Sequence, residues 1–538
     1  MSNPASPEDR DFTRRVHETQ ARLTRDLQRA YDVIVCGAGA SGSVLARRLA
    51  ENSAVQVLLL EAGGSDEAEA VLDPSLWPTN LGGERDWGFL AEPNPHLDGR
   101  ALPFSMGKGL GGGSSINVGI WARGHRTDWD FFASEAGDPA WGYENVLGIY
   151  RRIEDWRGLP DPHRRGVGGP VWVQPAADPS PVALALLDAA AEIGVPTFDS
   201  PNGAMMESQG GAAISDTLIR NGRRNSLYRA YVHPWLDRPN LTVLTGATVR
   251  RVTFDGRRAS GVEVLHDGEV KRIGARIEVV LSLGAIQTPK VLMHSGIGDR
   301  EELDRFSIPL VQHLPGVGRN LQDHVSFGCT WEYAEPLTPR NSGSEATLYW
   351  KSRPELEAPD LLFCQVEFPV PSDRTAARGV PEHGWTMFAG LAQPASRGRL
   401  RLRSADPLAP PSIDANFLSE PADVATAAAC IELCRDLGNA RAFRPFVTRE
   451  AMPGDLRGGG LDRYIREAAV TYWHQSCTAK MGRDEMSVVD AQLKVYGVDG
   501  LRVADASIMP RVTTGNTQAP CAIIGERAAE SLQRAHGL

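Results

Sequence analysis

A glycine-rich turn between an apolar strand and a helix is the feature that most constrains this chain. Gly37, Gly39 and Gly42 follow the apolar run Tyr31–Cys36 in the spacing GxGxxG, and the Ala/Leu/Arg-rich stretch Ser43–Ala50 comes next. In such a turn the first glycine makes the bend, the second lets the backbone approach a pyrophosphate, and the third lets helix and strand pack closely. The helix N-terminus then faces the anion. We therefore expect a strand–turn–helix unit that binds a dinucleotide.

An acidic residue at the end of the next apolar run supports this interpretation. The run Val55–Leu60 ends in Glu61, nineteen residues after Gly42. A carboxylate in this position accepts hydrogen bonds from a ribose hydroxyl, which favours an adenosine ribose without a 2′-phosphate. These residues do not choose between NAD and FAD, because the same unit serves both.

The composition predicts a soluble globular protein whose ligand is small. A chain of 538 residues is long enough for two or three domains, each with its own core. No apolar run approaches the roughly 18 residues that a membrane span needs. The formal net charge of −10 argues against affinity for nucleic acid, which depends on Lys and Arg at phosphates. Residues 1–30 lack the apolar segment of a secretory signal, so we expect a short surface helix there and a cytoplasmic protein.

Cysteines, tryptophans and paired arginines are predicted to have structural roles. Seven dispersed cysteines show neither the CxxC spacing of a metal site nor the density of a disulfide scaffold, so we expect free thiols and no metal. Cys430 and Cys434 are at helical spacing and are expected to pack in a core. Four tryptophans are also expected in cores: Trp129, Trp141, Trp331 and Trp350. Three arginine pairs are interpreted as solvated surface: residues 164–165, 223–224 and 250–251.

Three further motifs indicate what the dinucleotide site holds. Residues Gly107–Asn117 read G-K-G-L-G-G-G-S-S-I-N, and backbone so rich in glycine can lie flat against a large planar ligand. Residues Gly284–Gly298 follow the apolar run Ile277–Leu283 and suggest a second strand-to-helix junction. Near the C-terminus come H-Q-S-C-T-A-K-M-G from His474 and T-G-N-T-Q-A-P around Asn516.

With these motifs the chain resembles the glucose-methanol-choline (GMC) oxidoreductase family, FAD enzymes that oxidise alcohols. Other matching segments are W-A-R-G at Trp121, R-P-N-L-T-V at Arg238, L-P-G-V-G-R-N-L-Q-D-H ending at His324 and S-R-G-R-L at Ser396. Matches recur from Tyr31 to about Arg534. The resemblance implies an α/β fold, α+β overall: a Rossmann-like FAD-binding domain with a second, substrate-binding domain built on an antiparallel sheet with helices.

The resemblance also implies a set of FAD contacts. The pyrophosphate is expected at Gly37, Gly39, Ala40, Ser41 and Gly42, and the ribose at Glu61 and Ala62. The adenine is expected at the backbone of Val249, which ends a strand predicted over Thr242–Val249. The flavin is expected along Gly112, Ser114, Asn117, Val118, Gly119 and Ile120, beside Tyr472 and Trp473, and under Asp505, Ala506, Asn516 and Thr517. Some relatives attach FAD through a histidine just before this asparagine at 117, but Ile116 stands here, so we expect non-covalent FAD.

His474 and Asn516 are the candidate catalytic residues. Alcohol oxidation by a flavin removes a proton from oxygen and transfers a hydride from carbon to flavin N5. A neutral histidine can accept the proton, and an amide can hold the substrate oxygen without adding charge. The family uses a His/His or a His/Asn pair here, and Asn516 is similar to the choline oxidase and hydroxymethylfurfural oxidase branch. Without the family, His474 reads more readily as a hydrogen-bonded core histidine and Asn516 as a turn residue.

Two neighbouring positions bear on the same chemistry. His324 is a second candidate base, although the family pattern gives it a structural position near the flavin. Some oxidases of the family carry a valine where Tyr472 stands, beside the flavin at the point where oxygen reacts. The bulky phenol argues against fast reaction with oxygen.

The motifs are spread along the chain, so the FAD-binding domain is predicted to be discontinuous. We assign residues 1–30 to an N-terminal extension, residues 31–160, 231–324 and 466–538 to the FAD-binding domain, and residues 161–230 and 325–465 to the substrate-binding domain. The alternation R-L-R-L-R at Arg399–Arg403 predicts an antiparallel sheet with one wet face in the latter. Substrate is expected between this domain and the flavin.

The function expected from the sequence is FAD-dependent oxidation of a small alcohol, with a primary alcohol giving the aldehyde. The alternative is a relative that keeps FAD but performs non-oxidative chemistry, as a hydroxynitrile lyase or a light-driven decarboxylase. The sequence leaves open the substrate, whether oxygen or another electron acceptor is used, and whether the chain forms a homo-oligomer.

Overall fold

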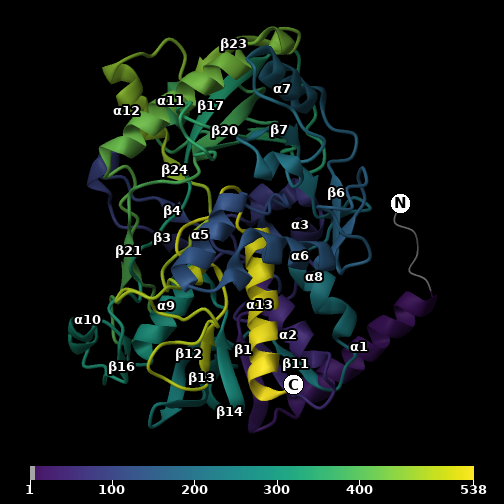
Figure 1. Ribbon diagram of the computed structural model, residues 1–538, viewed down its shortest axis with the longest axis vertical. Coiled ribbons are helices and arrows are strands. Elements are labelled where there is room, and N and C mark those ends of the chain that lie inside the picture. Colours follow the sequence, from purple (N-terminus) through teal and green to yellow (C-terminus); the bar gives the residue numbers. More distant parts are fainter. Residues whose placement is uncertain (1–6) are drawn as a thin grey trace.

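Two seven-stranded sheets organise the chain in the computed structural model, which describes residues 7–538 (Figure 1). The first sheet has the order β11-β2-β1-β14-β13-β12, with β25 paired to β14. Its parallel strands are β11 (Leu241–Leu244), β2 (Val57–Leu60), β1 (Ala30–Cys36), β14 (Glu269–Leu281) and β25 (Leu501–Val503). β12 (Thr248–Asp255) and β13 (Arg258–His266) extend it as an antiparallel meander.

Helices cover the parallel half of this sheet, as continuous apolar strands require. All four residues of β2 and the last four of β1 are buried. α2 (Ala40–Ala50) and α13 (Gln518–His536) pack against each other beside β1, and α9 (Gly284–His294) follows β14 (Figure 1). The predicted strand, turn, helix and second strand at 31–61 are therefore confirmed, as is the strand-to-helix junction before Gly284.

The second sheet is antiparallel and lies at the other end of the molecule (Figure 1). Its strands are β23 (Val447–Met452), β17 (Val325–Tyr333), β20 (Gly384–Leu391), β19 (Leu361–Val366), β18 (Ala346–Trp350) and β7 (Gly211–Ile214), with β24 (Val470–Thr471) paired to β17. The helices α7 (Pro181–Glu192), α11 (Pro421–Gly438) and α12 (Gly459–Ala468) pack on it. The rings of Trp331, Trp385 and Phe443 stack beneath α11 and fix this core. The predicted fold class is confirmed, while the domain boundaries stay a prediction.

One prediction about strands is wrong. The strand predicted over Thr242–Val249 is two strands, because the chain turns at 245–247 with Gly246 at φ +64°. β11 runs parallel to β2 before this turn, and β12 pairs antiparallel with β13 after it. The alternating segment at 399–403 does form an antiparallel strand with one buried face, β21 (Arg399–Arg401), but it pairs with β22 (Ser412–Asp414) in a two-stranded ribbon outside the second sheet. Alternation specifies one wet face and not the size of the sheet.

Two arginines that were interpreted as solvated are buried. Arg165 donates to the carboxylates of Glu154 and Asp216, and its guanidinium lies over the Trp156 ring. Arg224 donates to the Val71 carbonyl, and burial lowers its pKa to about 10. Sequence reasoning missed these roles because the partners are distant in the sequence: Asp216 lies 51 residues from Arg165, and Val71 lies 153 residues from Arg224.

The structure agrees with the remaining assignments of tryptophans, cysteines and the N-terminal helix. Trp129, Trp141 and Trp331 are buried, Trp350 is half-buried, and all seven cysteines are free, with Cys430 and Cys434 in the second core. α1 (Pro7–Arg25) is the expected surface helix, and the Gln20 amide ties it to β11 by donating to Leu241 O at 2.9 Å and accepting from Val243 N at 3.1 Å. The part of that prediction on residues 1–6 lies outside the described residues. No helix among residues 7–538 is long and apolar enough to cross a membrane, and the cytoplasmic location stays a prediction.

Candidate active site

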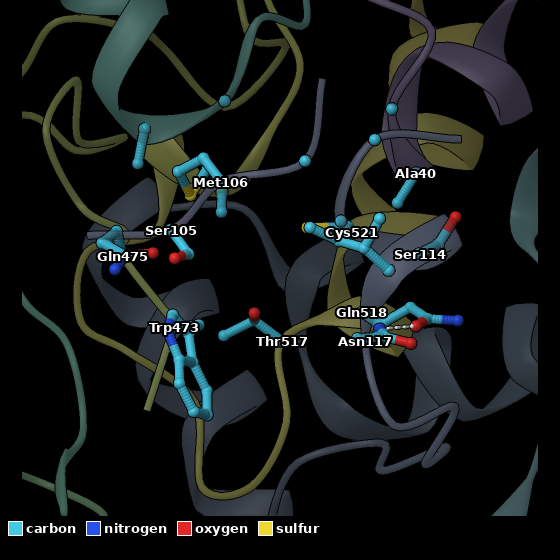
Figure 2. Close-up of a pocket in the computed structure, with 18 of the residues that line it drawn as sticks. Ala40, Ser105, Met106, Ser114, Asn117, Trp473, Gln475, Thr517, Gln518 and Cys521 are labelled. Atoms are coloured by element: carbon cyan, nitrogen blue, oxygen red, sulfur yellow. Dashed lines mark hydrogen bonds between the residues drawn. The ribbon is translucent and has the colours of Figure 1, made fainter. Parts of the chain in front are cut away.

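A long cavity lies between the two sheets and is lined by residues from both. Figure 2 shows Ala40, Ser114 and Cys521 on one side of it, and Ser105, Gln475 and Trp473 on the other, with Thr517 between them. Segments that are hundreds of residues apart in the sequence therefore meet at a single site. This is the arrangement that the scattered motifs predicted.

The three glycines of the first turn have three different surroundings. Gly37 has φ +100°, and a Cβ there would overlap the carbonyl oxygen of Ser282. A Cβ at Gly42 would overlap the carbonyl oxygen of Gly37, so this glycine permits the close approach of α2 to β1. A Cβ at Gly39 would meet no atom within 4 Å and would project into open space beside the cavity that Gly39 lines. Gly37 and Gly42 are thus needed for the fold, whereas Gly39 leaves room for a ligand.

The N-terminus of α2 is open at this point. Gly39 is its N-cap, no side chain caps the helix, and its first turn carries no acidic residue. The first N–H groups of a helix have no partner within the helix and attract anions. An 11-residue helix whose uncapped end meets the cavity fits a pyrophosphate.

Glu61 holds the loops around the cavity together. Its carboxylate accepts from the backbone N–H groups of Ala38 at 3.0 Å, Gly63 at 2.9 Å and Gly109 at 3.0 Å. Burial raises the pKa of this group, and the backbone hydrogen bonds oppose that rise. Glu61 lines the cavity, and the ribose contact stays a prediction. The structural role of Glu61 in joining the two glycine-rich loops was not predicted.

Several buried polar atoms on the cavity wall have no hydrogen-bond partner among the described residues. They are Ser282 Oγ, Gln287 Oε1, Ser344 Oγ, Gln475 Oε1, Asn516 Oδ1 and Gln518 Nε2. Buried polar groups are nearly always paired, so unpaired atoms along a cavity indicate a ligand with many polar atoms. FAD, with its ribityl hydroxyls, pyrophosphate and pyrimidine edge, fits this donor and acceptor set.

The two candidate catalytic residues are brought together from 42 positions apart. His474 Nε2 lies 3.2 Å from Asn516 Nδ2, and both residues line the cavity. On its other side, His474 Nδ1 lies 2.8 Å from Nδ1 of His324, which is completely buried. The backbone N–H of His474 donates to Asp323 at 2.9 Å, which fixes the backbone from which the imidazole projects.

These contacts assign the proton on each imidazole. Because the Asn516 amide nitrogen donates, His474 Nε2 must be unprotonated and accepts. His474 then carries its proton on Nδ1 and donates it to His324 Nδ1, so the proton of His324 lies on Nε2. Burial lowers the pKa of His474 well below 6.5, and it lowers the pKa of His324 to about 3. Both rings are neutral near pH 7, and His474 presents a basic nitrogen to the cavity.

Asp323 supports this arrangement of the two imidazoles through hydrogen bonds. Burial raises its pKa to about 7, while hydrogen bonds from the Thr471 hydroxyl and the His474 N–H act in the opposite direction. Thr471 Oγ1 also accepts from the Trp473 N–H at 2.8 Å. These hydrogen bonds therefore hold the segment 471–474 against residues 323–324 of the same chain.

Tyr472 lies against the base but does not point its hydroxyl into the cavity. Its ring stacks on His474 with centroids 5.1 Å apart, and its hydroxyl donates to the Phe388 carbonyl at 2.7 Å. The phenol thus fills the space beside the imidazole, where the sequence comparison within the family places a small residue in some oxidases. Its effect on the reaction with oxygen stays a prediction.

Most of the predicted site residues line the cavity. These are Gly37, Gly39, Ala40, Ser41, Glu61, Ala62, Gly112, Ser114, Asn117, Val118, Ile120, Val249, Tyr472, Trp473, His474, Asp505, Ala506, Asn516 and Thr517. Two do not reach its wall. Gly42 packs on Gly37, and Gly119 lies in a turn at φ +77°, where its N–H donates to the Asn117 side chain at 2.9 Å.

Sequence reasoning missed a group of lining residues outside the motifs. They include Trp77, Ser105, Met106, Ser344, Cys364 and Phe388. Ser105 and Met106 directly precede the glycine-rich motif, so extending the motif by two residues would have predicted them. Ser344, Cys364 and Phe388 have no local signal, because they reach the cavity through the packing of the second sheet and its loops. Trp77 reaches it from the short 3-10 helix Pro74–Asn80.

Comparison with known proteins identifies the family. The family model for GMC oxidoreductases matches residues 31–326 in its N-terminal part and 394–525 in its C-terminal part. A GMC-type oxidoreductase of Mycobacterium tuberculosis, described as uncharacterised, is 39% identical over 532 residues, 93% of this chain and 99% of the relative. An oxygen-dependent choline dehydrogenase of Pseudomonas savastanoi pv. phaseolicola is 37% identical over 540 residues, 94% of each protein.

A solved structure extends the match to three dimensions. The crystal structure of pyridoxine 4-oxidase from Mesorbium loti has a TM-score of 0.89 at 31% identity, and the match covers 94% of this chain and 99% of that one. The likeness therefore includes both sheets and the cavity between them. The chain belongs to the GMC oxidoreductase family, and it is an FAD-dependent enzyme that oxidises CH–OH donors.

Proposed function

We propose that this enzyme oxidises a primary alcohol to the aldehyde, with His474 as the general base and Asn516 as the group that positions the substrate hydroxyl. The observation that carries the proposal is the unprotonated Nε2 of His474, which faces the cavity 3.2 Å from the Asn516 amide. FAD, when bound, supplies the acceptor for the hydride that leaves the alcohol carbon. Choline dehydrogenase and pyridoxine 4-oxidase, by their names, also act on alcohols, which supports the same chemistry here.

The residues of the chain accomplish the proton transfer as follows. The substrate hydroxyl takes its place between Asn516 and His474, and the Asn516 amide orients it without adding a charge. His474 Nε2 accepts the hydroxyl proton, which leaves the oxygen electrons free to form the carbonyl bond as the hydride departs. The buried rings around His474 exclude water that would compete for the base. A placed general base of this kind typically contributes about 10²–10⁴ in rate.

The FAD is proposed to be held without a covalent bond. Ile116 lines the cavity where some relatives carry the attaching histidine, and its side chain has no nucleophile. Uncapped α2, Glu61 and the unpaired amides at 287 and 518 would hold the cofactor by hydrogen bonds alone. Denaturation in acid should release all of the flavin into the supernatant, and flavin that stays with the precipitated protein would contradict this.

The test of the proposed function is anaerobic reduction of the bound flavin by a panel of primary alcohols. At least one alcohol should bleach the visible absorbance of the flavin and yield one aldehyde per FAD. His474→Ala should slow this bleaching by about a hundredfold or more while FAD content is unchanged. His383→Ala is the matched control, because His383 is exposed and does not line the cavity.

Two outcomes would overturn the proposal. A His474→Ala rate within a fewfold of the parent would remove His474 as the base. Protein that retains FAD and is bleached by no alcohol of the panel would favour the non-oxidative alternative. Repeating the reaction in air, with peroxide measured, tests oxygen as the electron acceptor.

A further inference from the structure

The catalytic end of the cavity contains no charged side chain that would balance a cation. Among the described residues, the carboxyls on the cavity wall are those of Glu61 and Asp505, and no lysine or arginine lines it. Glu61 is bonded to three backbone N–H groups, and Asp505 accepts from Gly284 N at 2.9 Å, Ser507 N at 2.8 Å and the Thr288 hydroxyl at 2.6 Å. Both therefore belong to the dinucleotide half. An isolated positive charge at the other end would lose its hydration without an ionic partner.

The aromatic rings at the catalytic end of the cavity pack against one another. Trp473 stacks on Phe388 with centroids 5.8 Å apart and planes at 16°, and Trp77 meets Trp473 nearly at right angles at 6.1 Å. Phe388 also contacts Tyr472 at 4.7 Å. A cation–π site needs open ring faces directed at the cation. These rings instead form a continuous wall whose edges and remaining faces suit a flat apolar group.

The backbone at Trp473 is held in an unusual conformation that places this ring. Its φ is +60°, a region that side chains other than glycine rarely adopt and that costs of order 1 kcal/mol or more. The Thr471 hydroxyl accepts the Trp473 N–H at 2.8 Å and itself donates to Asp323. The same clamp that positions His474 therefore fixes the aromatic wall next to it, so substrate shape and base geometry are set together.

A hydroxyl group lies farther along the same wall. Ser344 is almost fully buried, lines the cavity, and makes no hydrogen bond to a described nitrogen or oxygen. It lies near the Cys364 thiol, which in turn lies near Tyr472, the residue stacked on His474. Ser344 is thus connected to the base through two intervening side chains, Cys364 and Tyr472. A polar group on the remote side of a substrate ring would reach it.

We propose that the substrate is an uncharged aromatic primary alcohol with a hydrogen-bonding substituent on its ring, which Ser344 binds. This inference rests on the proposed function and adds the substrate class to it. The ring lies along Trp473 and Phe388, the hydroxymethyl group reaches His474 and Asn516, and the ring substituent reaches Ser344. Cationic alcohols such as choline are poor substrates because their charge finds no carboxylate here.

The charge requirement is tested with two alcohols of the same shape. Choline and its neutral carbon analogue 3,3-dimethyl-1-butanol differ only in the charged nitrogen. Anaerobic flavin reduction by the FAD-loaded enzyme should give a kcat/KM for 3,3-dimethyl-1-butanol at least about tenfold above that for choline, and benzyl alcohol should exceed both. Choline equal to or better than its neutral analogue would overturn the inference, as would benzyl alcohol no better than the aliphatic alcohol.

Binding is read separately, so that failure of the proposed function remains distinguishable. Benzaldehyde and tetramethylammonium are added to the oxidised enzyme, and perturbation of the flavin spectrum is recorded. If benzaldehyde binds and tetramethylammonium does not, the substrate class is supported even where no alcohol reduces the flavin. A flavin that no alcohol reduces would then contradict only the proposed oxidation. Tighter binding of tetramethylammonium would overturn the substrate class while alcohol oxidation stands.

Ser344→Ala tests the remote contact. The variant should lower kcat/KM for 3- or 4-hydroxybenzyl alcohol by about tenfold, as expected for one lost hydrogen bond, and leave that for benzyl alcohol within about twofold. Ser342→Ala is the matched control, because Ser342 is also buried with an unpaired hydroxyl but does not line the cavity. Equal losses for substituted and unsubstituted benzyl alcohols would contradict a contact to the ring substituent.

Discussion

His474 has two ring nitrogens, and His324 decides which of them is free to act as the base. Its Nδ1 lies 2.8 Å from Nδ1 of His474 and accepts the proton there. We expect His324→Phe, which keeps a ring in the buried site but removes this acceptor, to populate the wrong tautomer and slow flavin reduction about tenfold to a hundredfold. Retained FAD together with ¹⁵N shifts of the His474 imidazole would separate this tautomer effect from a folding defect. An unchanged rate in His324→Phe would remove His324 as a positioning residue.

The burial of His474 predicts an unusual pH profile for the same step. Only the neutral imidazole accepts a proton, so kcat/KM is lost as pH falls through the pKa of His474. Because burial lowers that pKa well below 6.5, we expect kcat/KM to stay level from pH 8 to 6.5 and its acid limb to lie lower. Steady-state rates with a neutral alcohol check this, since the substrate does not titrate. A midpoint at or above 6.5 would show that the base is solvated, that it is another group, or that the profile follows Asp323, whose pKa burial raises to about 7.

Sequence reasoning reached the proposed catalytic pair but not its surroundings. His474 and Asn516 lie in recognisable motifs, and each has a chemical type suited to its role. The contact between His324 and His474 joins residues 150 positions apart, so nothing local reveals that one orients the other. Trp77 and Ser344 are still harder to find, because their roles exist only once the second sheet has packed over the cofactor half.

At the scale of single elements, the turn before α2 separates residues needed for folding from residues that make room for the ligand. In Gly42→Ala the new methyl group overlaps the Gly37 carbonyl, which belongs to the backbone and cannot rotate away. We expect a loss of about 3 kcal/mol or more in the free energy of unfolding. In Gly39→Ala the methyl group meets no atom within 4 Å at an ordinary φ of −69°, so the loss should stay within about 1 kcal/mol.

FAD binding should respond in the opposite order to these two changes. Gly39→Ala places a methyl group where the pyrophosphate approaches, so the folded variant should bind FAD at least about tenfold more weakly. Urea unfolding of the FAD-free proteins and FAD titration provide the two measurements. Equal stability losses in both variants, or undiminished FAD affinity in Gly39→Ala, would contradict this division of roles.

Elements were predictable where local pattern and tertiary environment agree. The β1–α2–β2 unit has apolar strands, glycines with specific steric roles and a terminal carboxylate, and each of these signals points to one structure. The segment 242–249 failed because two strands of similar composition are joined by a three-residue turn with one glycine. The prediction that Arg165 and Arg224 are solvated was wrong because a guanidinium is buried only when acids or carbonyls distant in the sequence accept its hydrogen bonds.

Over the whole molecule, the cofactor cavity is the place where the two sheets and most of the motifs meet. Its wall includes Ala40 from α2, Val249 from β12, Phe388 from β20 and Cys521 from α13. FAD would therefore contact both halves of the protein at once. A ligand that binds only the folded state stabilises it by an amount that grows with ligand concentration, about 2.7 kcal/mol at a hundredfold excess over Kd.

We therefore expect the thermal unfolding midpoint of FAD-free protein to rise progressively as FAD is added. The rise should be smaller in Gly39→Ala at equal FAD concentrations, although the midpoint of that variant without FAD should match the parent closely. AMP alone, which contacts only the nucleotide half, should give a smaller rise than FAD because it does not span the cavity. A midpoint that does not change with FAD, or one that AMP raises as much as FAD does, would mean that the flavin end of the cavity contributes nothing to joining the two sheets.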